Sequence, residues 1–267
     1  MELHAGADGE LGEHLAQVVL NGAGADEQAG TNLRVRQTLS GRPGDPGLLG
    51  SQRSASRADV IVHVYAAGFT PGELGWPGTW TDHAGRDRAP SMPGHELSGV
   101  VSELGYGTTG LTVGQRVFGL ADWTRDGSLA EYTAVEARNL APLPADIDYT
   151  VAAAVPISGL TARQGLFDHA GLKTGQTVLI HGAAGGVGSM TVQLAHELGA
   201  RVIGAGRAAD REAVLGLGAD VFVDLRAGRL KEAGEVDVVF DVIGGEVLED
   251  SSAGHQGLPR TAHCRAT

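Results

Sequence analysis

Residues 176–188 read Gln-Thr-Val-Leu-Ile-His-Gly-Ala-Ala-Gly-Gly-Val-Gly and join an apolar run to a cluster of glycines. The apolar run is continuous, which is typical of a strand that is buried on both faces of a parallel sheet. Apolar residues then recur at helical spacing as far as Leu198, and Gly199 follows at the position of a helix C-cap. A buried strand, a glycine-rich turn and an amphipathic helix together predict the first unit of a dinucleotide-binding fold.

The glycine-rich turn carries the chemistry of that unit. In the dinucleotide fingerprint the first glycine makes a tight turn, the second lets the backbone approach the pyrophosphate, and the third lets the helix pack on the strand. Alanine replaces the first of these glycines, and the alternative interpretation is a turn that binds nothing. We assign cofactor binding to the residues of the turn, which are Ala183, Ala184, Gly185, Gly186, Val187 and Gly188.

The strand that follows this helix indicates which dinucleotide binds. Sites for NAD place an Asp or Glu about 20 residues beyond the glycines, where it holds the ribose 2′-hydroxyl. The expected strand at 201–205 ends at Gly206-Arg207 and carries no acid there. The Arg207 guanidinium could pair with a 2′-phosphate, and the alternative is an ordinary solvated loop residue. The sequence therefore favours NADPH over NADH.

Regular elements are expected on both sides of this segment. Upstream, β-branched runs separated by turn glycines predict a small, mostly antiparallel β-barrel over 59–145. Downstream, strands and helices alternate, which predicts a doubly wound parallel sheet. The barrel strands are expected at 59–65, 97–104, 115–120 and 129–135. The sheet strands are expected at 177–181, 201–205, 221–223 and 237–242. The fold class is therefore α/β.

Composition narrows the class of partner. The net charge of −12 over 267 residues argues against a nucleic-acid binder. The single cysteine, Cys264, excludes a disulfide framework and a multi-cysteine zinc site. The longest apolar runs are far shorter than the ~18 residues of a membrane span, and the acidic start shows no signal sequence. We expect a cytoplasmic protein with no nucleic-acid or membrane partner.

Several segments resemble the medium-chain dehydrogenase/reductase superfamily, in its zinc-lacking quinone oxidoreductase branch. The resembling segments are 64–68, 93–101, 111–117 and 156–188. The last of them is the most specific, and the resemblance extends over about residues 59–250. It implies a GroES-like catalytic domain at 59–145 and a Rossmann domain at 146–250.

The resemblance also implies an activity, which is NADPH-dependent hydride transfer to a quinone or an α,β-unsaturated carbonyl compound. Thr161 matches a threonine near the nicotinamide. Thr70 stands where the family often has asparagine and could donate a hydrogen bond to the substrate carbonyl, which makes it the catalytic candidate. We also assign Val242 and Ile243 to the cofactor site.

Zinc-dependent relatives carry cysteines where this chain has Thr70 and Ile157. Neither residue can replace a thiolate, and a catalytic zinc site needs about three protein ligands. We therefore expect no metal. His95 stands at the position of a zinc-binding histidine in those relatives, and we expect it instead to be a hydrogen-bonding residue of the barrel.

Both ends of the chain depart from the family pattern. Residues 1–58 are expected to be a divergent and largely disordered head, and residues 251–267 a tail unrelated to the family. Four strands, where about six are usual, predict a truncated sheet with an open edge and an uncovered apolar face beside Val238, Phe240 and Val242. A change of reading frame in the gene would explain both ends.

Two functions stay open at this point. One is the NADPH-dependent reductase, and the other is a catalytically defective NADPH-binding protein from a truncated gene. The open edge predicts marginal stability or self-association, and the family's homodimers offer one route to it.

Overall fold

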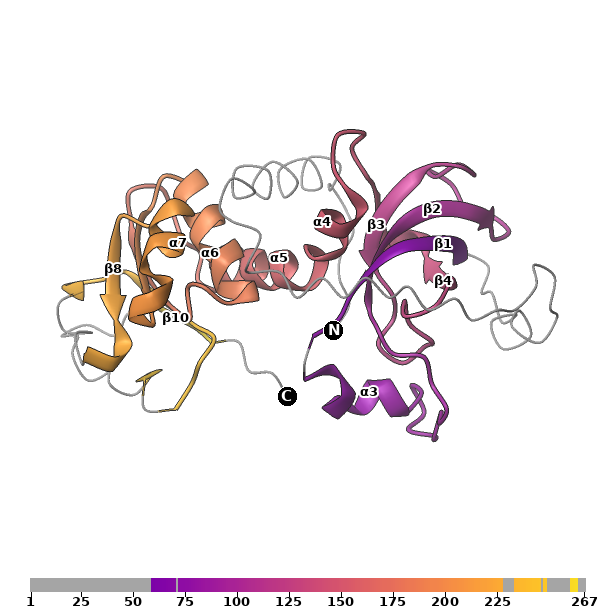
Figure 1. Cartoon of the computed structure of the whole chain (residues 1–267), viewed down its shortest axis with the longest axis horizontal. Helices are drawn as coiled ribbons and strands as arrows, with labels where there is room; N and C mark the ends of the chain where they lie inside the picture. Colours follow the sequence, from indigo (N-terminus) through magenta and orange to yellow (C-terminus); the bar gives the residue numbers. More distant parts are fainter. Residues whose placement is uncertain (1–58, 71, 228–232, 246, 249–259, 264–267) are drawn as a thin grey trace. The chain divides into compact units, whose positions relative to one another are not determined.

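The computed structural model describes residues 59–70, 72–227, 233–245, 247–248 and 260–263, so the expectation for the head at 1–58 lies outside the described residues. The chain divides into two compact units (Figure 1). Within the described residues the first unit ends at Pro156 and the second begins at Ile157. Each unit has its own sheet and its own core, and each is taken separately below.

The first unit is built on a five-stranded antiparallel sheet with the strand order β4-β1-β2-β3-β5. Its strands are β1 (Asp59–Gly68), β2 (Glu96–Leu104), β3 (Arg116–Leu120), β4 (Tyr132–Glu136) and β5 (Leu140–Pro142). Four of them lie where the β-branched runs predict, and β5 was not predicted. No pairing between β4 and β5 closes the described sheet into a barrel, so its described strands form an open GroES-like sheet.

One face of this sheet forms the core of the first unit. Apolar side chains alternate along the strands, as expected of an antiparallel sheet with one buried face. Its most deeply buried members come from β1, β2, β3 and β4: Val60, Val62, Leu97, Val101, Val117 and Val135. Short helices complete the unit, namely η1 (Glu73–Gly75), α3 (Pro77–Trp80), η2 (Ala137–Asn139) and α4 (Tyr149–Ala153).

The second unit is built on a five-stranded parallel sheet with the strand order β10-β9-β6-β7-β8. Its strands are β6 (Thr177–His181), β7 (Arg201–Gly206), β8 (Val221–Asp224), β9 (Val238–Asp241) and β10 (Arg260–His263). Its helices are α5 (Pro156–Arg163), the π-helix η3 (Gln164–His169), α6 (Gly186–Glu197), η4 (Ala208–Asp210), α7 (Arg211–Gly216) and η5 (Leu225–Ala227). The doubly wound α/β class predicted from the sequence is confirmed.

The central strands of this sheet are buried on both faces, which explains the unbroken apolar run at the end of β6. Every residue of β9 and all of β6 after Thr177 are buried. The helices approach closely, because a side chain on Gly204 of β7 would lie 2.4 Å from Val214 of α7. Gly199 ends α6 with a φ of +79°, as the sequence predicts for a C-cap glycine.

The prediction of four strands is wrong, because β10 adds a fifth. It pairs in parallel with β9, with Arg260 opposite Val238 and His263 opposite Asp241. The edge of β9 that we expected to be open is therefore paired. The short run Arg-Thr-Ala-His carries no apolar alternation, so the sequence pattern gave no sign of this strand.

The expected uncovered apolar face is also wrong. Val238 and Phe240 are 0% and 1% exposed, and Val242 is half-buried. The π-helix η3 lies against Phe240, because a side chain on Gly165 would lie 2.4 Å from the phenyl ring.

Candidate functional site

The glycine turn between β6 and α6 is held by its own backbone. Gly182 has a φ of +69°, a conformation that favours glycine. The Gly185 amide donates to the Gly182 carbonyl at 2.9 Å, and the Ser189 amide donates to the Gly185 carbonyl at 2.8 Å. A side chain on Gly188 would lie 2.0 Å from the Gly182 carbonyl oxygen. Glycine is therefore required at positions 182 and 188 for the turn itself.

The N-terminus of α6 is open to a ligand. Gly185 is the N-cap residue, and no side chain caps the first amide groups of the helix. Gly185 and Gly186 are both exposed, and a side chain on Gly185 would meet only the Gly182 carbonyl oxygen, at 3.3 Å. The N-terminus of a helix favours an anion because its amide groups are unpaired and the helix dipole is positive there. Here glycine leaves room for a phosphate group against the backbone.

The other residues of the turn, Ala183, Ala184 and Val187, differ in how deeply they are buried. Ala183 is fully buried and its amide donates to the Ala205 carbonyl at 3.1 Å, so it packs the turn onto β7. Its methyl group lies 3.2 Å from where Gly204 would carry a side chain. Ala184 and Val187 are half-buried, beside the exposed glycines.

Two other segments border the turn. Val242 and Ile243 follow β9 and lie against Gly182, where a side chain would be 2.8 Å and 3.3 Å from them. From α5, the Ser158 hydroxyl oxygen lies 3.1 Å from the position of a side chain on Gly186. Thr161 is half-buried one helical turn further along α5. Sequence reasoning missed Ser158, although its spacing of three from Thr161 places both on one helix face.

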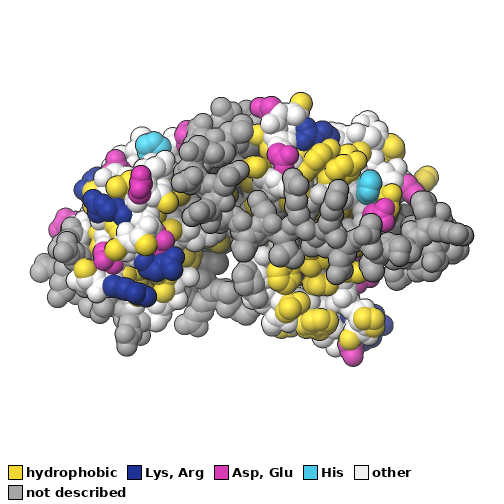
Figure 2. All heavy atoms as spheres, viewed as in Figure 1, with side chains coloured by type: hydrophobic (Ala, Val, Ile, Leu, Met, Phe, Trp, Pro, Cys, Tyr) yellow, Lys and Arg dark blue, Asp and Glu magenta, His cyan; other side chains and the backbone are white. Residues whose placement is uncertain are grey.

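Arg207 follows β7 and is exposed, but its guanidinium is engaged. Nε and Nη2 donate to the two carboxylate oxygens of Asp210, at 2.9 Å and 3.1 Å. The guanidinium holds the pKa of Asp210 below its usual value, and the carboxylate raises the pKa of Arg207. The sequence has no acid at Gly206-Arg207, where β7 ends, but the Asp210 carboxylate, three residues beyond Arg207, lies against the Arg207 side chain. Figure 2 shows Lys and Arg side chains, in dark blue, on this unit of an acidic protein.

A buried, hydrogen-bonded histidine–aspartate pair lies at the strand ends that lead into the turn. His181 ends β6, Asp241 ends β9, and His181 Nδ1 is 2.8 Å from Asp241 Oδ1. Both side chains are completely buried. Burial lowers the pKa of His181, and the Asp241 carboxylate opposes that shift. Neither residue was singled out from the sequence.

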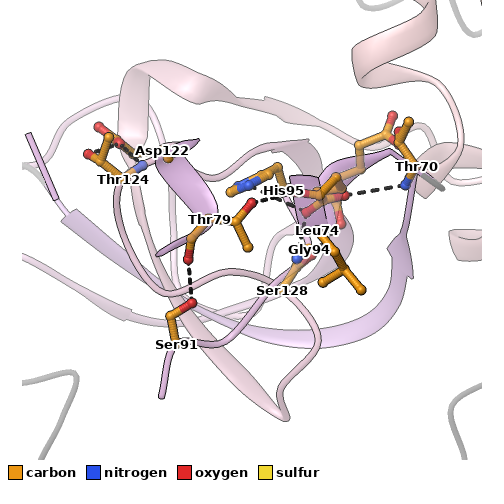
Figure 3. A network of polar contacts seen from close by, with 12 residues as sticks. Thr70, Leu74, Thr79, Ser91, Gly94, His95, Asp122, Thr124 and Ser128 are labelled. Carbon is orange, nitrogen blue, oxygen red and sulfur yellow. Dashed lines mark hydrogen bonds and ion pairs between the residues drawn. The ribbon is translucent and has the colours of Figure 1, made fainter. Parts of the chain in front are cut away.

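Thr70 belongs to the first unit and is described there alone. It is half-buried, two residues beyond β1, and its amide donates to Glu73 Oε2 at 3.3 Å (Figure 3). The other carboxylate oxygen, Glu73 Oε1, accepts from the Gly94 amide at 2.7 Å. Glu73 is fully buried, and burial raises its pKa. This carboxyl group therefore ties the Thr70 loop to the segment before β2.

His95 is not the hydrogen-bonding residue that we expected. Nε2 is 3.4 Å from Glu73 Oε1, yet neither ring nitrogen has a hydrogen-bond partner among the described residues. The reason is that aromatic rings surround the imidazole, with Trp123 at 4.5 Å and Trp76 at 6.2 Å between ring centroids. Burial lowers the pKa of His95 to about 4.

The described residues contain neither a cluster of metal-ligating side chains nor a helix that could span a membrane. No three His, Cys, Asp or Glu side chains of the described ranges gather closely enough to hold a metal ion. At the family's zinc position, His95 has Glu73 as its near neighbour and tryptophans elsewhere. None of the described helices has the length and apolar character needed to cross a bilayer.

Two family models match the chain, one in each unit. Residues 56–145 match the alcohol dehydrogenase GroES-like domain. Residues 186–254 match the zinc-binding dehydrogenase domain. Their order along the chain is the order of the two sheets.

Curated relatives match over both units. The chain is 45% identical over 164 residues to the spectinabilin polyketide synthase system protein NorB of Streptomyces orinoci, which covers 59% of this chain and 7% of NorB. It is 38% identical over 199 residues to an NADPH-dependent alkenal/one oxidoreductase of Arabidopsis thaliana, covering 69% of this chain and 50% of the relative. It is 32% identical over 202 residues to a quinone oxidoreductase of Rattus norvegicus, covering 72% of this chain and 59% of the relative. The chain thus spans about half the length of the two reductases.

Solved structures share the fold. An alcohol dehydrogenase superfamily protein from Novosphingobium aromaticivorans superposes with a TM-score of 0.70 at 32% identity, over 80% of this chain and 66% of that one. The CurK enoyl reductase superposes with a TM-score of 0.66 at 25% identity, over 77% of this chain and 71% of that one. From the two domain matches, these relatives and the shared fold, the chain belongs to the medium-chain dehydrogenase/reductase superfamily, in its quinone oxidoreductase-like branch.

Proposed function

We propose that the chain binds NADPH and reduces a quinone or the conjugated double bond of an α,β-unsaturated carbonyl compound, without a metal. The observation that carries the proposal is the open N-terminus of α6 behind the glycine turn, with exposed Gly185 and Gly186 and no side-chain cap. An uncapped helix N-terminus behind a glycine turn suits a pyrophosphate.

The residues around this turn divide the work of binding. Gly185 and Gly186 would bring backbone amides to the pyrophosphate, because no side chain shields them. Val242 and Ile243 would cover the start of the turn, against Gly182. Arg207 would pair with the 2′-phosphate, which favours NADPH over NADH. That contact has to compete with the carboxylate of Asp210.

Reduction would use the bound cofactor and few protein groups. NADPH, when bound, supplies a hydride from its nicotinamide ring. On α5, Thr161 and Ser158 would orient that ring, as the family resemblance implies for Thr161. The Thr70 hydroxyl would donate a hydrogen bond to the substrate carbonyl oxygen, where negative charge develops as the β-carbon accepts hydride. The residues at the family's zinc position, Thr70 and Ile157, supply no thiolate, so no metal enters the proposal.

The names of the relatives support this substrate class. The Arabidopsis relative is an NADPH-dependent alkenal/one oxidoreductase, and the rat relative is a quinone oxidoreductase. Alkenals, alkenones and quinones are all carbonyl compounds with a conjugated double bond, to which a hydride can add.

A second candidate substrate is an enoyl thioester. It is favoured by the 45% identity to a polyketide synthase protein and by the fold shared with an enoyl reductase. The reaction would be the same addition of hydride to a conjugated alkene, with a thioester in place of the ketone or quinone.

The test is NADPH consumption by the purified chain with three substrates: a small quinone, an enone and an enoyl thioester. We expect saturable consumption, followed at the nicotinamide absorbance, that falls in Thr70→Val while NADPH binding stays unchanged. The substrate with the highest kcat/KM decides between the two candidates. Binding of NADPH without consumption of it would favour the defective binding protein instead.

A further inference from the structure

His181 and Asp241 meet at the carboxyl ends of two neighbouring strands. They are opposite each other in the register of β6 and β9, and Nδ1 and Oδ1 are 2.8 Å apart. Both side chains are completely buried. Burying an imidazole and a carboxylate costs free energy that an apolar pair would not. A sheet that needed only packing at this point would be served by two apolar residues.

Each member of the pair directly precedes one of two turns at the candidate cofactor site. His181 is followed by the glycine turn at 182–188, and Asp241 is followed by the turn at 242–245. The carboxylate also organises its own turn. Its Oδ2 accepts from the Gly244 amide at 2.8 Å, and its Oδ1 accepts from the Ile243 amide at 3.4 Å. One buried carboxylate therefore links β6 to the backbone of the second turn.

This link sets the distance between the two turns. Val242 and Ile243 lie against Gly182, where a side chain would be 2.8 Å and 3.3 Å away. If the 242–245 turn moved, this wall at the start of the glycine turn would move with it. Burial lowers the pKa of His181 and favours the neutral imidazole, whose Nδ1–H group then donates a hydrogen bond to Asp241 Oδ1.

We propose that His181 and Asp241 are a positioning pair that holds the 242–245 turn against the glycine turn. Cofactor affinity then depends on the pair, although neither side chain touches the cofactor. The inference rests on the proposed function, because it assigns the pair to the same dinucleotide site. It adds two residues that act through their neighbours rather than on the cofactor itself.

Two substitutions of His181 in the full chain separate positioning from mere packing. His181→Leu removes the proton donor, whereas His181→Asn keeps an N–H group close to the place of Nδ1. Losing a hydrogen bond to a charged group corresponds to about a tenfold loss of affinity or more. We expect the NADPH Kd to rise by that factor in His181→Leu and to return to within about threefold of wild type in His181→Asn.

A structural readout that needs no cofactor accompanies the titration. Amide hydrogen exchange of the 242–245 segment should accelerate in His181→Leu and recover in His181→Asn. Leu172→Ala is the matched control, because Leu172 is buried in the same unit but lies before the start of β6, whereas His181 ends that strand. We expect it to lower stability while leaving the NADPH Kd and the exchange of 242–245 unchanged.

The outcomes decide the proposal in either direction. A folded His181→Leu protein with wild-type Kd and wild-type exchange at 242–245 would overturn it. So would a His181→Asn protein as impaired as His181→Leu, or a control in which affinity falls in step with stability. If the wild-type chain bound no dinucleotide, the proposed function would fail, while the exchange data would still decide whether the pair orders the turn.

Discussion

Gly185 and Gly188 belong to the same glycine cluster in the sequence but have different surroundings in the folded chain. A side chain on Gly188 would collide with the Gly182 carbonyl, whereas one on Gly185 would meet only the Gly182 carbonyl oxygen, at 3.3 Å. Gly188 is therefore needed for the fold, and Gly185 is free to serve a ligand.

This difference predicts that Gly185→Val folds but does not bind NADPH. The valine would stand between the backbone and the pyrophosphate, and we expect no binding at concentrations that saturate the wild type. The free energy of unfolding should stay within about 1 kcal/mol of wild type, as for most exposed substitutions. Gly216→Val in α7, where a side chain meets nothing within 4 Å, is the control and should bind normally. Tight NADPH binding by Gly185→Val would show that the turn is not the phosphate site.

Arg207 and Asp210 predict opposite effects on cofactor choice. Arg207→Glu should raise the NADPH Kd about tenfold or more, because a charged partner of the 2′-phosphate becomes a repelling one, and should leave NADH nearly unchanged. Asp210→Asn should release the guanidinium and lower the NADPH Kd by about two- to fivefold, the worth of an exposed ion pair. Arg201→Glu makes the same charge change at the opposite end of β7 and should alter neither affinity. Equal losses for both cofactors in Arg207→Glu would remove the NADPH assignment.

His95 predicts acid sensitivity of the first unit. Its pKa is about 4 in the folded chain, against a usual 6.5, so the unfolded chain takes up a proton that the folded unit refuses. Stability from this group is present above pH 6.5 and is lost as the pH falls from 6.5 towards about 4. The full effect is on the order of 3 kcal/mol. The Glu73 carboxyl, whose pKa burial raises, acts in the opposite sense as the pH rises above 4.5.

Urea unfolding between pH 7 and pH 5 measures this effect, followed by tryptophan fluorescence. All three tryptophans, Trp76, Trp80 and Trp123, lie in the first unit, so the signal reports that unit alone. His95→Phe should flatten the loss of stability with falling pH, and His83→Phe, at an exposed position, should not. An unchanged slope in His95→Phe would assign the acid sensitivity to another group.

At the scale of elements, the sequence predicts the helices and strands whose ends are marked by a local pattern of residues. The strands β6 and β7 and the helix α6 lie within about one residue of their predicted bounds, because apolar runs and glycines mark both ends of each. The short strands β5 and β10 were not predicted, because they are defined by backbone pairing with a strand distant in sequence and not by a local pattern. The same holds for the site. The glycine turn is local in sequence, but Asp241 lies 60 residues from His181 and only the sheet brings them together.

The strand β10 predicts a stabilising role for residues 260–263. Thr261→Pro removes a backbone donor from the strand that pairs with β9. We expect the second unit to lose stability while the tryptophan-reported transition of the first unit stays in place. Circular dichroism in the far ultraviolet follows both units and fluorescence follows only the first. Coincident wild-type transitions by both probes in the variant would show that β10 adds nothing to stability.

At the scale of the whole molecule, an exposed apolar patch near α3 leads us to expect self-association. Figure 2 shows hydrophobic side chains gathered over α3 and its neighbouring loops, where Leu74 and Trp80 are 49% and 39% exposed. Contiguous exposed apolar surface is typical of interaction sites. We propose a homodimer, and light scattering after size-exclusion chromatography should give about twice the chain mass of 27.4 kDa. Leu74→Glu should shift the protein towards the monomer, and a wild-type mass of one chain at every concentration would refute the dimer.

Hydride transfer from NADPH to a conjugated substrate is the central claim, and isotope labelling tests it most directly. The full chain is incubated with an enone and, in two separate reactions, with NADPH that carries deuterium at one or at the other of the two C4 positions of the nicotinamide ring. The products are examined by mass spectrometry. We predict a saturated ketone that carries one deuterium on its β-carbon in one of the two reactions only. A product without deuterium in both reactions, or no product from a chain that binds NADPH, would contradict the account.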